Sequence, residues 1–174
     1  AGRQAWLPKT AVAPSAVAIP GDRVFMTSSY DVGSVMFKVQ KSGDKFVARS
    51  LFTLTPQQFA SDCHTPIVYK DRIFGVSNHR FTCLDFDGKL VWASPEDVKY
   101  GLGGYLLADG LFFVLQADGG KVRMAEASAD GWKELAVAQP LSGSEVWAPP
   151  VVVSGKLLVR DMKKLVCLEV GPGK

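Results

Sequence analysis

The 174-residue sequence predicts an all-β protein in which one antiparallel sheet pattern occurs four times. Each copy starts with a polar turn followed by an apolar run, and the first apolar residues are Val24, Ile73, Leu111 and Leu157. They lie 49, 38 and 46 residues apart, a spacing typical of propeller blades or another repeat array. Gly and Pro separate the apolar runs, so short strands are expected, with single helical turns fitting only at 55–62 and 95–99.

The second copy shows the pattern most clearly. Its predicted strands cover 66–69, 73–77, 81–86 and 90–93, and Asp87-Gly88 forms the tight turn of the last hairpin. Four antiparallel strands in each repeat are typical of a β-propeller blade. The fold class predicted is therefore an all-β propeller of four-stranded antiparallel blades.

The other copies follow the same order with variation. The predicted strands are 16–19, 24–28, 35–39 and 46–52 in the first copy, 104–107, 111–116, 122–127 and 132–137 in the third, and 150–153, 157–160 and 165–170 in the fourth. The fourth copy thus lacks its last strand. We expect blades over 15–54, 64–94, 101–140 and 147–170.

A candidate for the missing strand occurs at the N-terminus. Gly2-Arg3-Gln4-Ala5-Trp6 matches Gly88-Lys89-Leu90-Val91-Trp92 at the glycine, the base and the tryptophan. Residues 1–6 are therefore expected to complete the fourth blade, or the missing half of a larger propeller completes it, since an open sheet would expose apolar edges. Residues 1–174 then form a single propeller domain, whole or partial. A chance match is the alternative interpretation.

Composition excludes several classes of function. Hydrophobic residues make up 47% and charged residues 21% of the chain, which is an ordinary globular balance. The net charge of +3 is small and the basic residues do not cluster, which argues against nucleic-acid binding. No apolar stretch approaches the ~20 residues that a membrane-spanning helix needs.

The cysteines and histidines do not form a catalytic or metal pattern. Cys83 and Cys167 occupy matching positions of two repeats, which indicates small core residues on equivalent strands rather than a disulfide. Cys63 is next to His64, and neighbouring side chains on a strand point to opposite faces, so they are not expected to act as nucleophile and base. Zinc needs three or four ligands, whereas His64 and His79 are the only histidines. We predict no catalytic residue and no metal site.

The stretch from Leu84 to Trp92 resembles the blade signature of bacterial pyrroloquinoline-quinone-like repeat propellers. The signature residues are Asp85, the turn Gly88-Lys89 and Trp92, with Gly2 and Trp6 as their N-terminal matches. The residues around 28–34, 147–150, 160–161 and 167–169 share this resemblance. It implies that the tryptophan packs between neighbouring blades. Family members usually have seven or eight blades, so this chain resembles about half of one.

The resemblance implies two kinds of function. True quinoprotein dehydrogenases bind the quinone with calcium, but their ligand set has no counterpart here, where Asn78 is the single asparagine. No cofactor is therefore expected in this chain. The alternative is that the chain is a fragment of a dehydrogenase whose cofactor site lies mostly in an absent half, and only then would the quinone and calcium be expected. The resemblance also reaches outer-membrane-assembly scaffold lipoproteins. It implies a non-enzymatic, periplasmic or secreted scaffold whose partner is a protein, the other half-propeller or a second copy.

A propeller also predicts where a ligand would bind. The first strand of each blade lines the central channel, and the loops that enter these strands converge at one mouth. By the repeat alignment these loops carry five candidate ligand-binding residues, Cys63, His64, Tyr100, Gly101 and Trp147. An exposed tryptophan with a histidine suits a sugar or another small ligand. The alternative is that Trp147 packs between blades. Because a strand rather than a helix follows Gly101-Leu102-Gly103-Gly104, these glycines are expected to serve packing and not phosphate binding.

Overall fold

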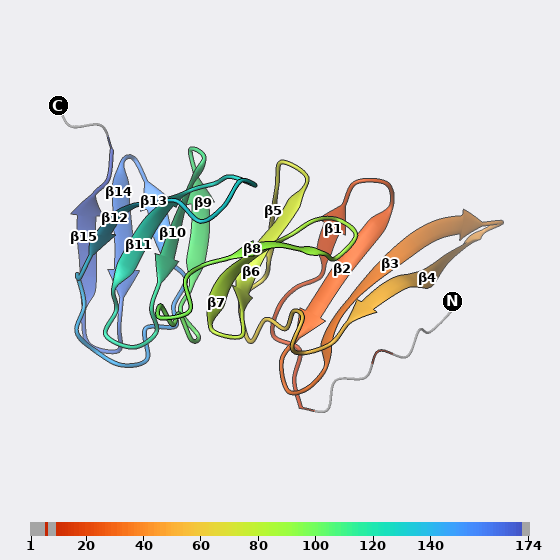
Figure 1. Cartoon of the computed structure of the whole chain (residues 1–174), viewed down its shortest axis with the longest axis horizontal. Coiled ribbons are helices and arrows are strands. Elements are labelled where there is room, and N and C mark those ends of the chain that lie inside the picture. Colours follow the sequence, from red (N-terminus) through yellow and green to blue (C-terminus); the bar gives the residue numbers. More distant parts are fainter. Residues whose placement is uncertain (1–5, 7–9, 172–174) are drawn as a thin grey trace. The chain divides into compact units, whose positions relative to one another are not determined.

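The computed structural model describes residue 6 and residues 10–171, and all of their regular structure is β-sheet (Figure 1). Within these residues, fifteen strands form four antiparallel sheets, each with its strands in sequence order. The chain divides into two compact units, residues 1–78 with 82–91 and residues 79–81 with 92–174. Each unit is described by itself below.

The first sheet contains β1 (Val17–Ile19), β2 (Arg23–Ser28), β3 (Gly33–Ser42) and β4 (Lys45–Leu54), in the order β1-β2-β3-β4. The rings of Phe25 and Phe59 meet edge to face with centroids 5.8 Å apart. They belong to the core of the first unit, whose buried residues are Ile19, Phe25, Met36, Leu54, Phe59, Ile73 and Leu84.

The second sheet contains β5 (Ile67–Tyr69), β6 (Arg72–Ser77), β7 (Arg80–Leu84) and β8 (Leu90–Ala93), again in sequence order. β6 is buried along almost its whole length, because both of its faces are covered. A strand buried on both faces reads as a continuous apolar run, and this is why 73–77 is easily recognised in the sequence.

The third sheet contains β9 (Tyr105–Ala108), β10 (Leu111–Leu115), β11 (Val122–Glu126) and β12 (Glu134–Ala138). The fourth contains β13 (Val151–Val153), β14 (Lys156–Arg160) and β15 (Leu165–Glu169). A core in the second unit lies between these sheets and consists of Phe113, Leu115, Val122, Leu141, Val146, Leu157 and Val159.

The repeated polar turn has a conformational cause. It joins the first two strands of each sheet, as a two-residue hairpin loop in three sheets and as the three-residue loop Pro20-Gly21-Asp22 in the first. The last two residues of every loop have positive φ, and in the two-residue loops this is what type I′ turns require to match the twist of the flanking strands. Gly, Asp and Asn tolerate this conformation best, which explains the composition of the turn. The pairs with positive φ are Gly21-Asp22, Lys70-Asp71, Asp109-Gly110 and Ser154-Gly155.

The all-β prediction is confirmed, and each strand predicted within the described residues is present. β8 coincides with the predicted 90–93. The largest difference is in β3 and β4, which extend over 33–42 and 45–54 instead of 35–39 and 46–52. At the distal end of β3, Gln40, Lys41 and Ser42 are polar and exposed, so they extend the strand without extending its apolar run. The stretch 55–62 contains one helical turn, in which Phe59 N–H donates to the Thr55 carbonyl at 3.1 Å.

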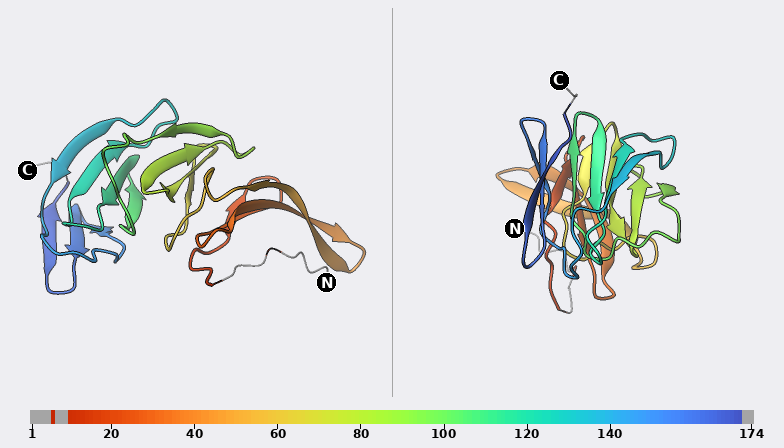
Figure 2. Two further views of the ribbon diagram at one scale, coloured as in Figure 1. Left: turned by 60° about the horizontal axis from the view of Figure 1, so that its bottom comes forward. Right: turned by 90° about the vertical axis from the view of Figure 1, so that its left-hand side faces the viewer.

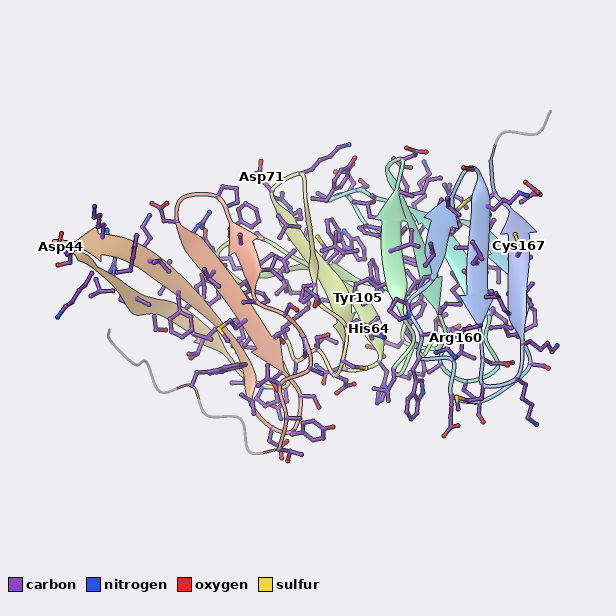
Figure 3. All side chains as sticks on the ribbon, turned by 180° about the vertical axis from the view of Figure 1, so that it is seen from behind. Asp44, His64, Asp71, Tyr105, Arg160 and Cys167 are labelled. Atoms are coloured by element: carbon purple, nitrogen blue, oxygen red, sulfur yellow. The ribbon has the colours of Figure 1, made fainter. Side chains whose placement is uncertain are left out.

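Two expectations need comment at the fourth sheet. The predicted strand 1–6 lies outside the described residues apart from Trp6, which is not in a strand. Cys167 was expected in the core, and this is wrong: it is exposed, whereas Cys83 is buried. Cys167, which Figure 3 labels, alternates along β15 with the half-buried Val166 and Leu168, so it lies on the face of the strand that points away from the core.

Among the described residues, no helix is long and apolar enough to cross a membrane.

Candidate functional site

The five candidate ligand-binding residues lie in loops that enter the first strands of their sheets. Cys63 and His64 precede β5 in the first unit, and Tyr100 and Gly101 precede β9 in the second. Trp147 precedes β13, also in the second unit. The expected positions in the chain are therefore found, while their gathering at one channel mouth stays a prediction.

The Cys63 segment is held by hydrogen bonds rather than arranged for catalysis. Ser61 N–H donates to Thr27 Oγ1 at 3.0 Å, and Ser61 Oγ donates to the His64 carbonyl oxygen at 2.7 Å. Burial, and secondly the neighbouring Asp62 carboxylate, raise the pKa of the Cys63 thiol. A raised pKa keeps the thiol protonated at neutral pH, which is the opposite of what an activated nucleophile needs.

Tyr100 is buried in a group of rings that we call the aromatic cluster. Its ring centroid lies 6.5 Å from that of Phe81 and 6.1 Å from that of Trp132. Burial raises the pKa of the Tyr100 hydroxyl. The backbone of Tyr100 accepts hydrogen bonds from Gly103 and Ala117, so this residue shapes the loop. The cluster consists of Phe81, Trp92, Tyr100, Tyr105, Phe112 and Trp132.

The glycines after Tyr100 allow backbones to approach closely. A Cβ atom on Gly103 would lie 1.9 Å from the Leu115 carbonyl oxygen, and one on Gly104 would lie 2.8 Å from Pro149 Cα. Only glycine fits such positions. The segment leads into β9 and not into a helix, as expected for a packing role.

Trp147 differs from the signature tryptophan Trp92. The Trp92 indole N–H donates to the Ser128 carbonyl oxygen at 3.2 Å, and its ring lies 6.2 Å from that of Trp132, which precedes the outer strand of the next sheet. Trp147 is 48% exposed. Its ring is therefore available to a ligand at the surface of the second unit.

The residues of the blade signature form a turn with defined contacts. Asp85 Oδ1 accepts hydrogen bonds from the backbone N–H of Asp87 at 2.9 Å and of Lys89 at 2.8 Å. Gly88 has a φ of +80°, and a Cβ atom there would lie 2.6 Å from the Phe52 ring. The Asp85 carboxylate thus accepts hydrogen bonds from two backbone N–H groups of the turn, and Gly88 permits the positive φ that the turn needs. Gly2 lies outside the described residues.

Sequence reasoning missed a similar aspartate turn between β14 and β15. Asp161 is buried, and its Oδ1 accepts hydrogen bonds from Lys163 N–H at 2.7 Å and Lys164 N–H at 2.8 Å. These hydrogen bonds lower the pKa of the Asp161 carboxyl, and the bond from the Lys163 backbone N–H has the largest effect. The signal available in the sequence was an Asp close behind an apolar run, as at Asp85.

Replacing Asp161 by Asn is expected to destabilise the protein in a pH-dependent way. Because the folded-state pKa is depressed, the carboxylate stabilises the fold at pH 7, and this contribution is lost as the pH falls through the folded-state pKa. Thermal unfolding of the wild type and Asp161→Asn should therefore differ at neutral pH and converge in acid. The exposed Asp97→Asn serves as control. A difference that does not change between neutral and acidic pH would contradict the role of the charge.

The described residues do not fit a calcium–quinone site. Among residue 6 and residues 10–171, no three His, Cys, Asp or Glu side chains are placed to hold a metal ion. Calcium takes six to eight oxygen ligands. The Asn78 side-chain amide instead donates to the carbonyl oxygens of Pro56 at 3.1 Å and Gln57 at 3.2 Å, which ties down a loop. The expectation that this chain binds no cofactor stays a prediction.

Comparison with known proteins adds evidence on the fold. No protein-family model matches the sequence, and no curated protein matches it. Among solved structures, the crystal structure of BamB from Moraxella catarrhalis is similar, with a TM-score of 0.60 and 13% sequence identity. The match covers 90% of this chain and 43% of that chain, so the present chain spans less than half of the BamB structure. This likeness shows the fold: the chain is part of a β-propeller.

Proposed function

We propose that this chain is a non-catalytic β-propeller scaffold that binds a protein partner through its outer strands. The observation that carries the proposal is the exposure of apolar side chains on those strands. Leu90 of β8 is 63% exposed and Leu135 of β12 is 46% exposed, and each has an exposed valine near it in the same strand. Apolar side chains grouped on unpaired outer strands are typical of surfaces that bind another chain.

The likeness to BamB supports the proposal at the level of the fold. The resemblance to outer-membrane-assembly scaffold proteins supports a periplasmic or secreted location in a bacterium. The partner is a protein chain. The remaining half of a larger propeller and a second copy of this chain are two such partners. The match covers 43% of the BamB structure. This share supports the other half-propeller as the partner, because the rest of a propeller of that size would be at least as long as this chain.

Photo-cross-linking from the outer strands tests the proposal. A photoreactive amino acid at Leu90 or Leu135 should give one discrete cross-linked product, identified by mass spectrometry, in cells that produce the protein. The same amino acid at Ser154, an exposed position in a turn, is the control. The product from Leu135 should be lost when an aspartate replaces Val137, which lies two residues away on the same face of β12, because a charge disfavours an apolar contact. If every position yields only the uncross-linked monomer, the scaffold function is wrong.

The exposure of Trp147 favours a second candidate, a sugar or small-ligand binder. Because the side chain is half exposed, Trp147→Ala is expected to change the free energy of unfolding by at most about 1 kcal/mol. Loss of a buried Trp would cost about 3–5 kcal/mol. Urea unfolding separates a surface role from packing. Sugar binding that is the same in the wild type and Trp147→Ala would disfavour the ligand role.

A further inference from the structure

The hairpin of β3 and β4 extends beyond the rest of its sheet, as Figure 2 shows. β2 pairs with β3 only as far as Arg23↔Lys38, whereas β3 and β4 continue to pair up to Ser42↔Lys45. The distal part is therefore two-stranded. Two-stranded hairpins are marginally stable in water, so a long one that serves only to complete a blade is not expected. We call residues 38–51 the basic hairpin.

The basic hairpin has two different faces. Cross-strand partners lie on the same face of a sheet, and faces alternate along each strand. The pairs Lys41↔Phe46 and Val39↔Ala48 make one face largely apolar. The other face carries Lys45 and the pair Lys38↔Arg49, with the pair Gln40↔Val47 between them. Phe46 is 69% exposed, so the apolar face is open to solvent at its distal end.

The charge on the hairpin is unbalanced. Lys38 pairs with Asp22 at 3.7 Å, but Lys41, Lys45 and Arg49 form no ion pair among the described residues. Asp44, at the tip, is the hairpin's one acidic residue (Figure 3). Lys38 and Arg49 are directly opposite each other, an arrangement of like charges that destabilises a sheet. A partner with carboxylates on this face would remove that repulsion.

The outer edge of β4 is available for pairing. β4 is the last strand of its sheet, and its residues are exposed from Lys45 to Leu51. Such an edge presents unpaired N–H and C=O groups that can accept a further strand. A groove of about 630 Å³ adjoins the hairpin and is lined by Ile19, Val24, Val39, Lys41 and Phe46, with Ala18, Asp22, Arg23 and Gln40.

We propose that β4 accepts an extended acidic segment of a protein partner as an additional strand. Alternate residues of that segment are acidic, where they face Lys45 and Arg49, and apolar, where they lie beside Phe46. The main-chain hydrogen bonds provide affinity, and the alternation selects the partner. The inference rests on the proposed scaffold function, because it names one binding surface and the chemistry of its partner.

A labelled peptide of about eight residues with alternating Glu and Val tests the proposal by fluorescence anisotropy on the full chain. Saturable binding is expected, weakening as salt is added. The double variant Lys45→Glu/Arg49→Glu should bind about tenfold more weakly, since two attractions become repulsions. The matched control Lys70→Glu/Lys89→Glu changes the net charge equally and should bind as the wild type does. Urea unfolding of both variants verifies that they are folded.

Two further probes distinguish the alternatives. A peptide with its four Glu and four Val in separate blocks should bind weakly. Equal binding of both peptides would overturn strand addition in favour of simple charge attraction. Vesicles of phosphatidylcholine with one-third phosphatidylglycerol test an anionic membrane surface. Vesicle binding that is lost in the double variant, without peptide binding, would overturn the proposal.

Cross-linking in cells separates this inference from the scaffold function. If the Leu90 and Leu135 cross-links persist unchanged in Lys45→Glu/Arg49→Glu, and the alternating peptide does not bind, the basic hairpin is not a binding surface while the scaffold function stands. If no position gives a cross-link, the scaffold function itself fails.

Discussion

Phe81→Ala is expected to lower the free energy of unfolding by about 3–5 kcal/mol. Phe81 is fully buried, and its ring lies 4.9 Å from that of Phe112 and 5.4 Å from that of Tyr105, centroid to centroid. The truncation leaves a cavity at the centre of the aromatic cluster, which its rigid neighbours cannot fill. Urea unfolding followed by tryptophan fluorescence measures the loss, because Trp92 and Trp132 contact the same ring.

Phe46→Ala is the matched control for Phe81→Ala. It removes the same atoms from a side chain that is 69% exposed, so a change of about 0.5 kcal/mol or less is expected. The same variant should weaken binding of the alternating peptide. Equal destabilisation by the two substitutions would contradict the buried position of Phe81.

Gly33→Ala is expected to cost about 2–5 kcal/mol, for two reasons that add. Gly33 has a φ of +79°, which L-residues adopt at a cost. A Cβ atom there would also lie 2.1 Å from the Leu54 carbonyl oxygen, a backbone atom that can move only if the sheet shifts. Thermal and urea unfolding measure the effect.

Gly43→Ala separates these two contributions. Gly43 lies in the turn of the same hairpin with a φ of +60°, and a Cβ atom there would meet nothing within 4 Å. Only the conformational cost of about 1–2 kcal/mol should remain. If Gly43→Ala destabilises as much as Gly33→Ala, the steric argument at Gly33 fails.

The sheets were predictable from the sequence because their central strands are buried on both faces. Residues such as Ile73 and Phe112 lie in unbroken apolar runs, and the type I′ turns between the strands need residues that tolerate positive φ. The distal end of β3 was not predictable in the same way. Residues 40–42 pair with β4 but are polar and exposed, so they leave no apolar signal.

The candidate site was predictable only in part. The repeat alignment placed Cys63 and Trp147 in loops that enter first strands, because the alignment reports chain position. It could not report burial, which depends on neighbours far away in sequence. Tyr100 is therefore found inside the aromatic cluster, and Cys167 is exposed because it lies on the face of β15 that points away from the core. The Asp161 turn was missed because an Asp close behind an apolar run does not by itself show that its carboxylate is buried and hydrogen-bonded.

The sequential strand order within each sheet has a consequence for how the protein forms and changes. In each of the four sheets, strands that are hydrogen-bonded neighbours are also consecutive in the chain. The loops that must close are short, so the entropy lost in forming a sheet is small, and each sheet can assemble as the ribosome releases it. The same property makes a sheet a self-contained unit in the gene. Duplication or deletion of one such segment adds or removes a sheet without rerouting the others, which is how repeat proteins change in length.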